Sequence, residues 1–235
     1  MPFIYFGGGS DTMIITLILF GVVILSMVVQ SRVTGTFRKY SQVPDRSGLT
    51  GAEVARRILD ENGLSDVNIE HSPGGFLSDH YDPRSRVLRL SREVYQGSNI
   101  AALGVAAHEC GHAIQHGEHY GAFKLRQALA PTAGIGSQAG MLLFIVGLIM
   151  SWPPLTYAGI GLYALIVIFQ LITLPVELNA SSRALSILES GGYMDWEEAG
   201  GAKKVLSAAA MTYLMSALVG ILSLLRLISL ANDRR

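Results

Sequence analysis

The sequence is divided into long apolar stretches and stretches rich in polar residues. Three of the apolar stretches carry no charged side chain: residues 12–31, 127–176 and 205–225. An α-helix needs roughly 20 apolar residues to cross a hydrocarbon core about 30 Å thick. The first stretch therefore predicts a membrane-spanning helix over residues 12–31, and the third predicts another over residues 205–228.

The middle stretch is too long for a single crossing, because it contains 50 uncharged residues. Trp152-Pro153-Pro154 interrupts it, and the two prolines favour a turn between helices. We therefore predict two spanning helices here, over residues 134–151 and 155–175, and about four in the whole chain. Both carry small residues that let helices approach closely, at Gly136, Gly140, Gly159 and Gly161.

The composition agrees with a mainly α-helical integral membrane protein. Half of the 235 residues are hydrophobic and 15% are charged, against about 25% charged residues in soluble domains. A soluble domain with these helices as its core is the alternative, but it leaves too little polar sequence to cover the apolar surface. A cleaved signal peptide is the alternative for residues 12–31, although no basic residue precedes them. We predict a multi-pass protein of the cell membrane.

The charge balance excludes one class of partner. The 18 basic and 18 acidic residues give a net charge of zero, whereas nucleic-acid-binding surfaces are strongly basic. We therefore expect a lipid bilayer, and no nucleic acid, as partner. Cys110 is the single cysteine, so no disulfide can form within the chain.

Basic residues predict the direction in which the chain crosses the membrane. Several follow the first span and none precedes it: Arg32, Arg38, Lys39, Arg46, Arg56 and Arg57. Because positive charges accumulate on the cytoplasmic side, the N-terminus is expected outside and residues 32–126 in the cytoplasm. The two middle spans then return Glu177 to the cytoplasmic side. The orientation of the C-terminus stays open, since an outward last span places Arg226 at membrane depth, where it either snorkels or lines a polar cavity.

Residues 32–126 are predicted to fold as a small α+β domain. Thr50-Gly-Ala-Glu53 has the pattern of a capping box and predicts a helix that runs to about Glu61. Residues 67–70 and 87–90 alternate between apolar and polar positions, which predicts a β-hairpin with a wide loop.

The next helix carries the candidate chemistry. Ser98 or Asn99 can cap it, and it is expected to run to about Gly117. It contains the motif His108-Glu109-Cys110-Gly111-His112, whose histidines stand four residues apart and so reach one ion from the same face. Neutral imidazoles bind zinc, and a catalytic zinc has three protein ligands and an open position. We predict one zinc ion per chain, with Glu109 as the general base.

The third ligand is expected from one of three residues. His116 and His119 follow the motif closely, but ligands at successive turns drift around a helix. Glu177 is the stronger candidate, because it directly follows the long uncharged stretch. A carboxylate next to a membrane-spanning segment is energetically costly, and metal binding would account for its presence. An ordinary glutamate at a helix N-terminus is the alternative. Cys110 is expected to pack as a small apolar residue rather than to bind metal.

Three segments resemble the YugP-type neutral zinc metallopeptidases of bacterial membranes: Ser78-Asp-His-Tyr-Asp-Pro83, His108-Glu-Cys-Gly-His-Ala-Ile-Gln-His116 and Leu174-Pro-Val-Glu-Leu-Asn-Ala-Ser-Ser-Arg183. More distantly, the layout is similar to the HtpX heat-shock protease and the CAAX prenyl protease, in which two spans follow the motif and a later element supplies a glutamate ligand. The resemblance implies a gluzincin-like cytoplasmic domain in which residues 176–204 carry Glu177 as the third ligand.

The resemblance also bears on residues around the motif. The related proteases carry an aspartate where this chain has Ser181, which leaves open whether Ser181 contacts a ligand histidine as that aspartate does. By the same analogy, the strand before the motif offers its edge to an extended peptide, and His80 or Tyr81 contacts the reaction intermediate. The alternative is a polar loop whose side chains only fix the turn.

Two functions of different classes are compatible with these features. The first is a zinc-dependent endopeptidase that cleaves peptides or membrane proteins at the cytoplasmic face. The second is a metal-stabilised membrane scaffold that binds a partner protein, or another copy of the chain, without hydrolysis. A transporter is disfavoured, because the spans lack the paired ionisable residues typical of that class.

Overall fold

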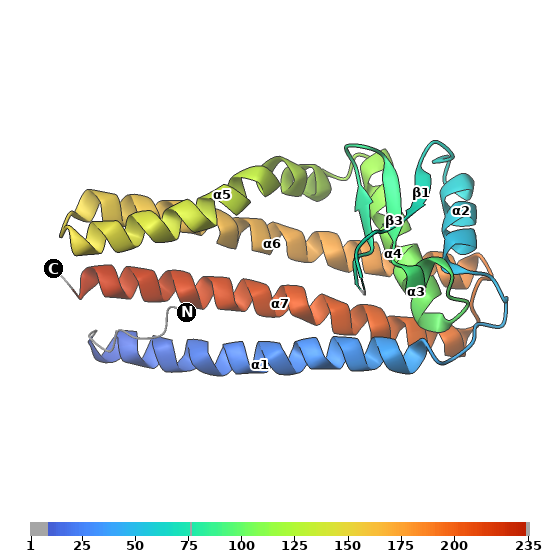
Figure 1. Cartoon of the computed structure of the whole chain (residues 1–235), viewed down its shortest axis with the longest axis horizontal. Helices are drawn as coiled ribbons and strands as arrows, with labels where there is room; N and C mark the ends of the chain where they lie inside the picture. Colours follow the sequence, from blue (N-terminus) through green and yellow to red (C-terminus); the bar gives the residue numbers. More distant parts are fainter. Residues whose placement is uncertain (1–8, 76, 234–235) are drawn as a thin grey trace. The chain divides into compact units, whose positions relative to one another are not determined.

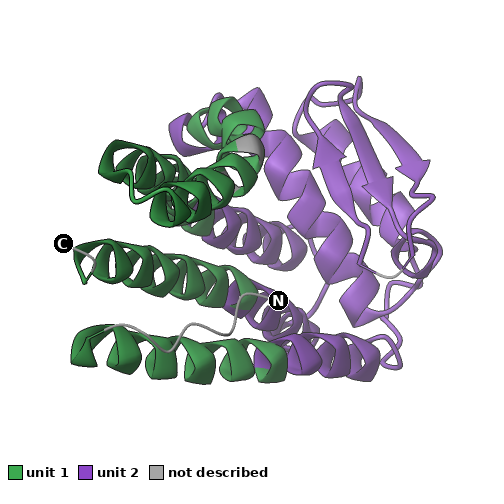
Figure 2. Cartoon of the chain, turned by 60° about the vertical axis from the view of Figure 1, so that its left-hand side comes forward, with its two compact units in different colours: residues 1–28, 125–174, 212–235 green, residues 29–124, 175–211 purple. Residues whose placement is uncertain are grey.

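The computed structural model describes residues 9–75 and 77–233, and for residues 135 and 137 it describes the backbone alone. These residues divide into two compact units, unit 1 (residues 1–28, 125–174 and 212–235) and unit 2 (residues 29–124 and 175–211) (Figure 2). Seven helices and three strands are described (Figure 1), in the order α1 (Ser10–Tyr40), α2 (Gly51–Glu61), β1 (Asn68–His71), β2 (His80–Asp82), β3 (Val87–Leu90), α3 (Arg92–Tyr95), α4 (Ile100–Gly117), α5 (Gly121–Ile149), α6 (Pro153–Ser190) and α7 (Trp196–Asn232).

Unit 1 is built from apolar helix segments. Among the described residues, three helices are each long and apolar enough to cross a membrane: α1, α6 and α7. Helix α5 qualifies only when its two segments, Gly121–Gly134 and Gln138–Ile149, are counted together across a bend of 43°. Pro131 removes one hydrogen bond of the helix ladder close to this bend. The structure therefore provides three candidate spans, or four if the bent helix is one of them.

Helices α5 and α6 pack closely within unit 1, as their small residues predicted. A Cβ atom added at Gly159 would lie 2.4 Å from the Phe144 backbone nitrogen, and one at Gly140 would lie 2.9 Å from the Gly159 carbonyl oxygen. Only glycine permits this approach of two backbones. Gly161 contributes nothing to it, because a Cβ atom there meets no described atom within 4 Å. The predicted turn is confirmed, since α5 ends at Ile149 and α6 begins at Pro153.

Polar side chains join α1 and α7 in unit 1. The Arg226 guanidinium donates a hydrogen bond through Nε to Thr16 Oγ1 at 3.0 Å, so this arginine finds a polar partner on the neighbouring helix. Thr12 Oγ1 donates to Asp233 Oδ2 at 2.7 Å. A polar side chain without a partner is costly in apolar surroundings, so these contacts satisfy groups that would otherwise destabilise the helix pair.

Unit 2 contains a three-stranded sheet in the order β1-β3-β2. The predicted hairpin of residues 67–70 with 87–90 is wrong, because β1 and β3 pair in parallel. Parallel neighbours need a crossover connection. Here that connection contains β2, which pairs antiparallel with β3, Tyr81 opposite Leu88. Strand β2 therefore lies at the edge of the sheet.

The two helices predicted in unit 2 from their caps are confirmed. Thr50 and Glu53 form the reciprocal hydrogen bonds of a capping box at the start of α2. The Asn99 side chain accepts a hydrogen bond from the Ala102 amide at 2.9 Å and so caps α4, which ends at Gly117 as expected. Both helices bury apolar faces in one core, which fixes the position of α4 and its motif.

Helix α6 is longer than the sequence suggested. The predicted span ended at residue 175 and a separate element was expected from residue 176, but one helix continues from Pro153 to Ser190. Pro175 lies inside it and removes a single backbone donor. Glu177 therefore lies within α6, in the part of this helix that belongs to unit 2.

Candidate metal centre

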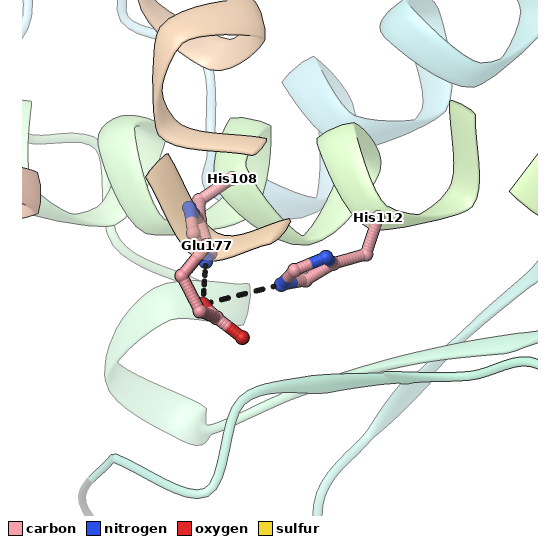
Figure 3. Close-up of side chains that lie close together, drawn as sticks. All are labelled: His108, His112 and Glu177. Carbon is pink, nitrogen blue, oxygen red and sulfur yellow. Dashed lines mark hydrogen bonds and ion pairs between the residues drawn. The ribbon is translucent and has the colours of Figure 1, made fainter. Parts of the chain in front are cut away.

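Two ligand candidates lie on α4 and the third lies on α6. Ligand atoms of His108, His112 and Glu177 all lie within 4.8 Å of one another. Glu177 Oε2 is 3.2 Å from His108 Nε2 and 3.5 Å from His112 Nε2 (Figure 3). The structure thus brings together the two motif histidines and the distant glutamate that the sequence analysis favoured as third ligand.

Close contact between α4 and α6 in unit 2 allows Glu177 to reach the histidines. A Cβ atom added at Gly111 would lie 2.8 Å from the Ala180 carbonyl oxygen and 3.2 Å from the Ala180 Cα atom. Any larger residue at position 111 would push the two backbones apart. Glu177 lies three residues before Ala180 on α6 and therefore faces the motif across this contact.

The second nitrogen of each histidine is held by a polar side chain. His108 Nδ1 lies 3.1 Å from Ser181 Oγ, and His112 Nδ1 lies 3.0 Å from Gln115 Oε1. Such contacts orient a ligand ring and direct its other nitrogen at the metal. Ser181 therefore contacts one of the two candidate ligand histidines through its hydroxyl group. The sequence analysis did not identify Gln115, for which the only signal is an amide side chain three residues after the candidate ligand His112 on the same helix.

Glu109 is buried beside the candidate ligands. Its Oε2 accepts a hydrogen bond from the backbone amide of Tyr81, on edge strand β2, at 3.0 Å. Burial raises the pKa of Glu109 to about 7, while the electrostatic interaction with the neighbouring His108 opposes this shift and the carboxylate of Glu177 reinforces it. A carboxyl group with a pKa near neutrality can both accept and release a proton, as a general base and acid must.

The remaining candidates lie outside the ligand cluster. Cys110 is fully buried, and its thiol contacts the Ala55 carbonyl oxygen at 3.7 Å. Burial raises the pKa of this thiol far above its ordinary value, so Cys110 packs in the core. His116 Nδ1 lies 2.9 Å from Tyr81 Oη instead, and His119 occupies the turn after α4 with φ of 59°. His80, the first residue of β2, is exposed, and its Nδ1 lies 2.9 Å from the Ser78 carbonyl oxygen.

The chemistry of the donor set fits zinc. Two imidazole nitrogens and one carboxylate oxygen form a common three-ligand set of catalytic zinc sites, which keep a fourth position open. Calcium and magnesium prefer sites made of oxygen ligands alone. His112 and Glu177 are buried, so a bound ion would be largely shielded from bulk water.

Comparisons with known proteins bear on this site. The model of a family described as "Putative neutral zinc metallopeptidase" matches residues 14–232. The chain is 50% identical over 211 residues to a Bacillus subtilis (strain 168) protein named "Putative membrane protease YugP". The alignment covers 90% of this chain and 93% of that relative. No solved structure matches the chain.

Proposed function

The chain belongs to the family described as "Putative neutral zinc metallopeptidase", as its motifs indicated, and from this membership we propose that it is a membrane-embedded zinc-dependent endopeptidase. The observation that carries the proposal is the convergence of His108, His112 and Glu177, whose ligand atoms lie within 4.8 Å of one another. In this proposal these three residues hold one zinc ion, and Glu109 is the general base.

The residues around the site have defined roles in the proposed reaction. When bound, zinc polarises the scissile carbonyl and makes water more acidic. Glu109 takes the proton of the attacking water on its carboxylate and later passes it to the leaving amine. The amide of Tyr81 holds Glu109 Oε2 and so fixes the carboxylate beside the ligands. Ser181 and Gln115 hold the imidazole rings of His108 and His112 in place.

We further propose that the substrates are peptides or membrane proteins and that cleavage occurs at the cytoplasmic face, in a gluzincin-like domain. Three helices long enough to span a membrane support membrane location. The cluster of basic residues after the first span supports a cytoplasmic position for residues 32–126. The edge position of β2 beside Glu109 supports binding of an extended peptide.

Metal removal tests the proposed activity. Purified full-length protein in detergent is expected to contain one zinc ion per chain and to cleave an unstructured protein such as casein. A strong chelator should abolish cleavage, and added zinc should restore it, because the three ligands remain in place. Absence of stoichiometric metal, or cleavage that persists after complete metal removal, would contradict the proposal.

Cysteine labelling tests the proposed orientation. Wild-type protein is a clean background, because its single cysteine, Cys110, is buried. In intact cells, a membrane-impermeant maleimide is expected to label Ser151→Cys, in the exposed turn between α5 and α6, and to leave Arg84→Cys unlabelled. Both variants should react once the cells are lysed. Labelling of Arg84→Cys in intact cells would place residues 32–126 outside and contradict the proposal.

A further inference from the structure

A fully buried amide side chain links the two helices of the candidate metal centre. Gln115 lies on α4 and is completely shielded from solvent. Its Oε1 lies 3.0 Å from His112 Nδ1, and its Nε2 donates to the Val176 carbonyl oxygen and to Asn179 Oδ1, both at 2.9 Å. A buried amide is costly unless its donors and acceptor are paired, and all three of these contacts are short.

The partners on α6 determine which way the amide points. The Val176 carbonyl oxygen can only accept a hydrogen bond. Asn179 Oδ1 accepts another hydrogen bond from Arg183 Nε at 2.8 Å, which marks it as the oxygen of that side chain. Two acceptors therefore face the NH₂ group of Gln115, and its carbonyl oxygen faces His112.

This orientation sets the proton position on His112. Because a carbonyl oxygen cannot donate, His112 Nδ1 carries the hydrogen, and the neutral ring keeps its lone pair on Nε2. That nitrogen is the one directed at Glu177, at 3.5 Å. The contact between His108 and Ser181 is compatible with a hydrogen on either ring nitrogen of His108, because the Ser181 hydroxyl can donate or accept.

The Gln115 side chain also binds the segment of α6 that carries Glu177. Val176 directly precedes Glu177, and Asn179 lies two residues after it, so Gln115 binds the helix on either side of the ligand. The connection continues from Asn179 through Arg183, which pairs with Glu118 at the end of α4 at 2.7 Å.

We propose that Gln115 is a positioning residue of the metal centre, which holds His112 with Nε2 available to the metal and holds the Glu177 segment of α6 at a set distance from it. The inference rests on the proposed zinc site and extends it to a residue outside the ligand set. Contacts of this kind typically contribute about 10–100-fold to metal affinity.

Two substitutions separate positioning from simple packing. Gln115→Met has a similar length and no hydrogen-bonding group. Gln115→Glu keeps an oxygen that accepts from His112 Nδ1 but loses the donor to α6. Because both variants lose that donor, the difference in zinc affinity between them reports on the contact to His112 alone. If Gln115 only fills space, the apolar methionine should be tolerated best, since a buried carboxyl group is costly.

The measurement is the zinc affinity of each full-length variant, determined by competition with a chromophoric chelator. We expect wild type to bind most tightly, Gln115→Glu less tightly, and Gln115→Met about 10–100-fold more weakly than wild type. Leu103→Ala is the control, because Leu103 is fully buried and its loss should lower thermal stability without changing zinc affinity. The absorption bands of the cobalt-substituted protein should change in Gln115→Met and not in Leu103→Ala.

The possible failures are distinguishable. If the wild-type protein binds no zinc, the proposed function itself is wrong. Wild-type protein that binds zinc, together with a Gln115→Met variant that binds it as tightly as wild type or as Gln115→Glu, would overturn the positioning role alone. If Gln115→Met does not fold, Gln115→Glu decides the question, since zinc affinity and cobalt bands equal to those of wild type would overturn the proposal.

Discussion

Replacing Glu109 with glutamine is expected to lower kcat for peptide hydrolysis by about 10²–10⁴-fold, the usual contribution of a general base, while zinc stays bound. Glutamine has nearly the same shape, and its carbonyl oxygen can still accept the hydrogen bond from the Tyr81 amide. It cannot take up a proton at neutral pH. The measurement is kcat and KM on an unstructured peptide, with zinc content determined on the same samples.

A matched control separates this effect from a general change of charge. Glu93→Gln alters an exposed glutamate on α3 and should leave both activity and zinc content unchanged. If Glu109→Gln is about as active as wild type, Glu109 is not the general base. Parallel loss of zinc would show that the carboxylate supports the metal instead.

The same variant distinguishes a protease from a scaffold. If the chain cleaves membrane proteins, fragments present in wild-type membranes should be missing when Glu109→Gln replaces the native protein. A scaffold that only needs bound metal would give identical membrane proteomes for the two proteins. Folding and zinc content are expected to be equal in both, so the comparison reports on hydrolysis.

Glu177→Gln is expected to weaken zinc binding by more than about 100-fold, the upper end of what contacts outside the ligand set contribute. The carboxylate oxygen lies within 3.5 Å of both histidine Nε2 atoms. An amide of the same size lacks the negative charge that stabilises a divalent ion there. Zinc should raise the melting temperature of wild type, because a ligand that binds only the folded state stabilises it, and this increase should be lost in the variant.

The control for this prediction lies on the same helix. Glu189→Gln changes an exposed glutamate near the end of α6 and should retain the wild-type zinc content and melting temperature. Zinc retained at the wild-type level by Glu177→Gln would exclude Glu177 as a ligand. His116 and His119 would then need to be tested as ligands, which would require His116 to leave its contact with Tyr81.

The sequence alone determined the features that depend on neighbouring residues. Uncharged stretches of about 20 residues predict spans through the hydrophobic effect, and three such helices are present. The caps at Thr50 and Asn99 were predictable because they satisfy amides only a few residues away. The spacing of His108 and His112 likewise follows from the turn of one helix. Glu177 was favoured by its position after an uncharged stretch and by family resemblance.

Tertiary structure decided the features in which distant segments meet. The alternation of apolar and polar residues predicted β1 and β3 as strands, but the predicted antiparallel pairing between them is wrong. Their relative direction depends on the path of the chain through β2, which an alternating pattern within each strand does not encode. Helix α6 continues through Pro175 although the proline removes one backbone hydrogen bond, whereas a proline in the sequence favours a helix boundary. Two of the three partners of Gln115, on α6, lie 61 and 64 residues away along the chain. No local pattern encodes these contacts, because a buried polar group finds its partners only once the helices have packed.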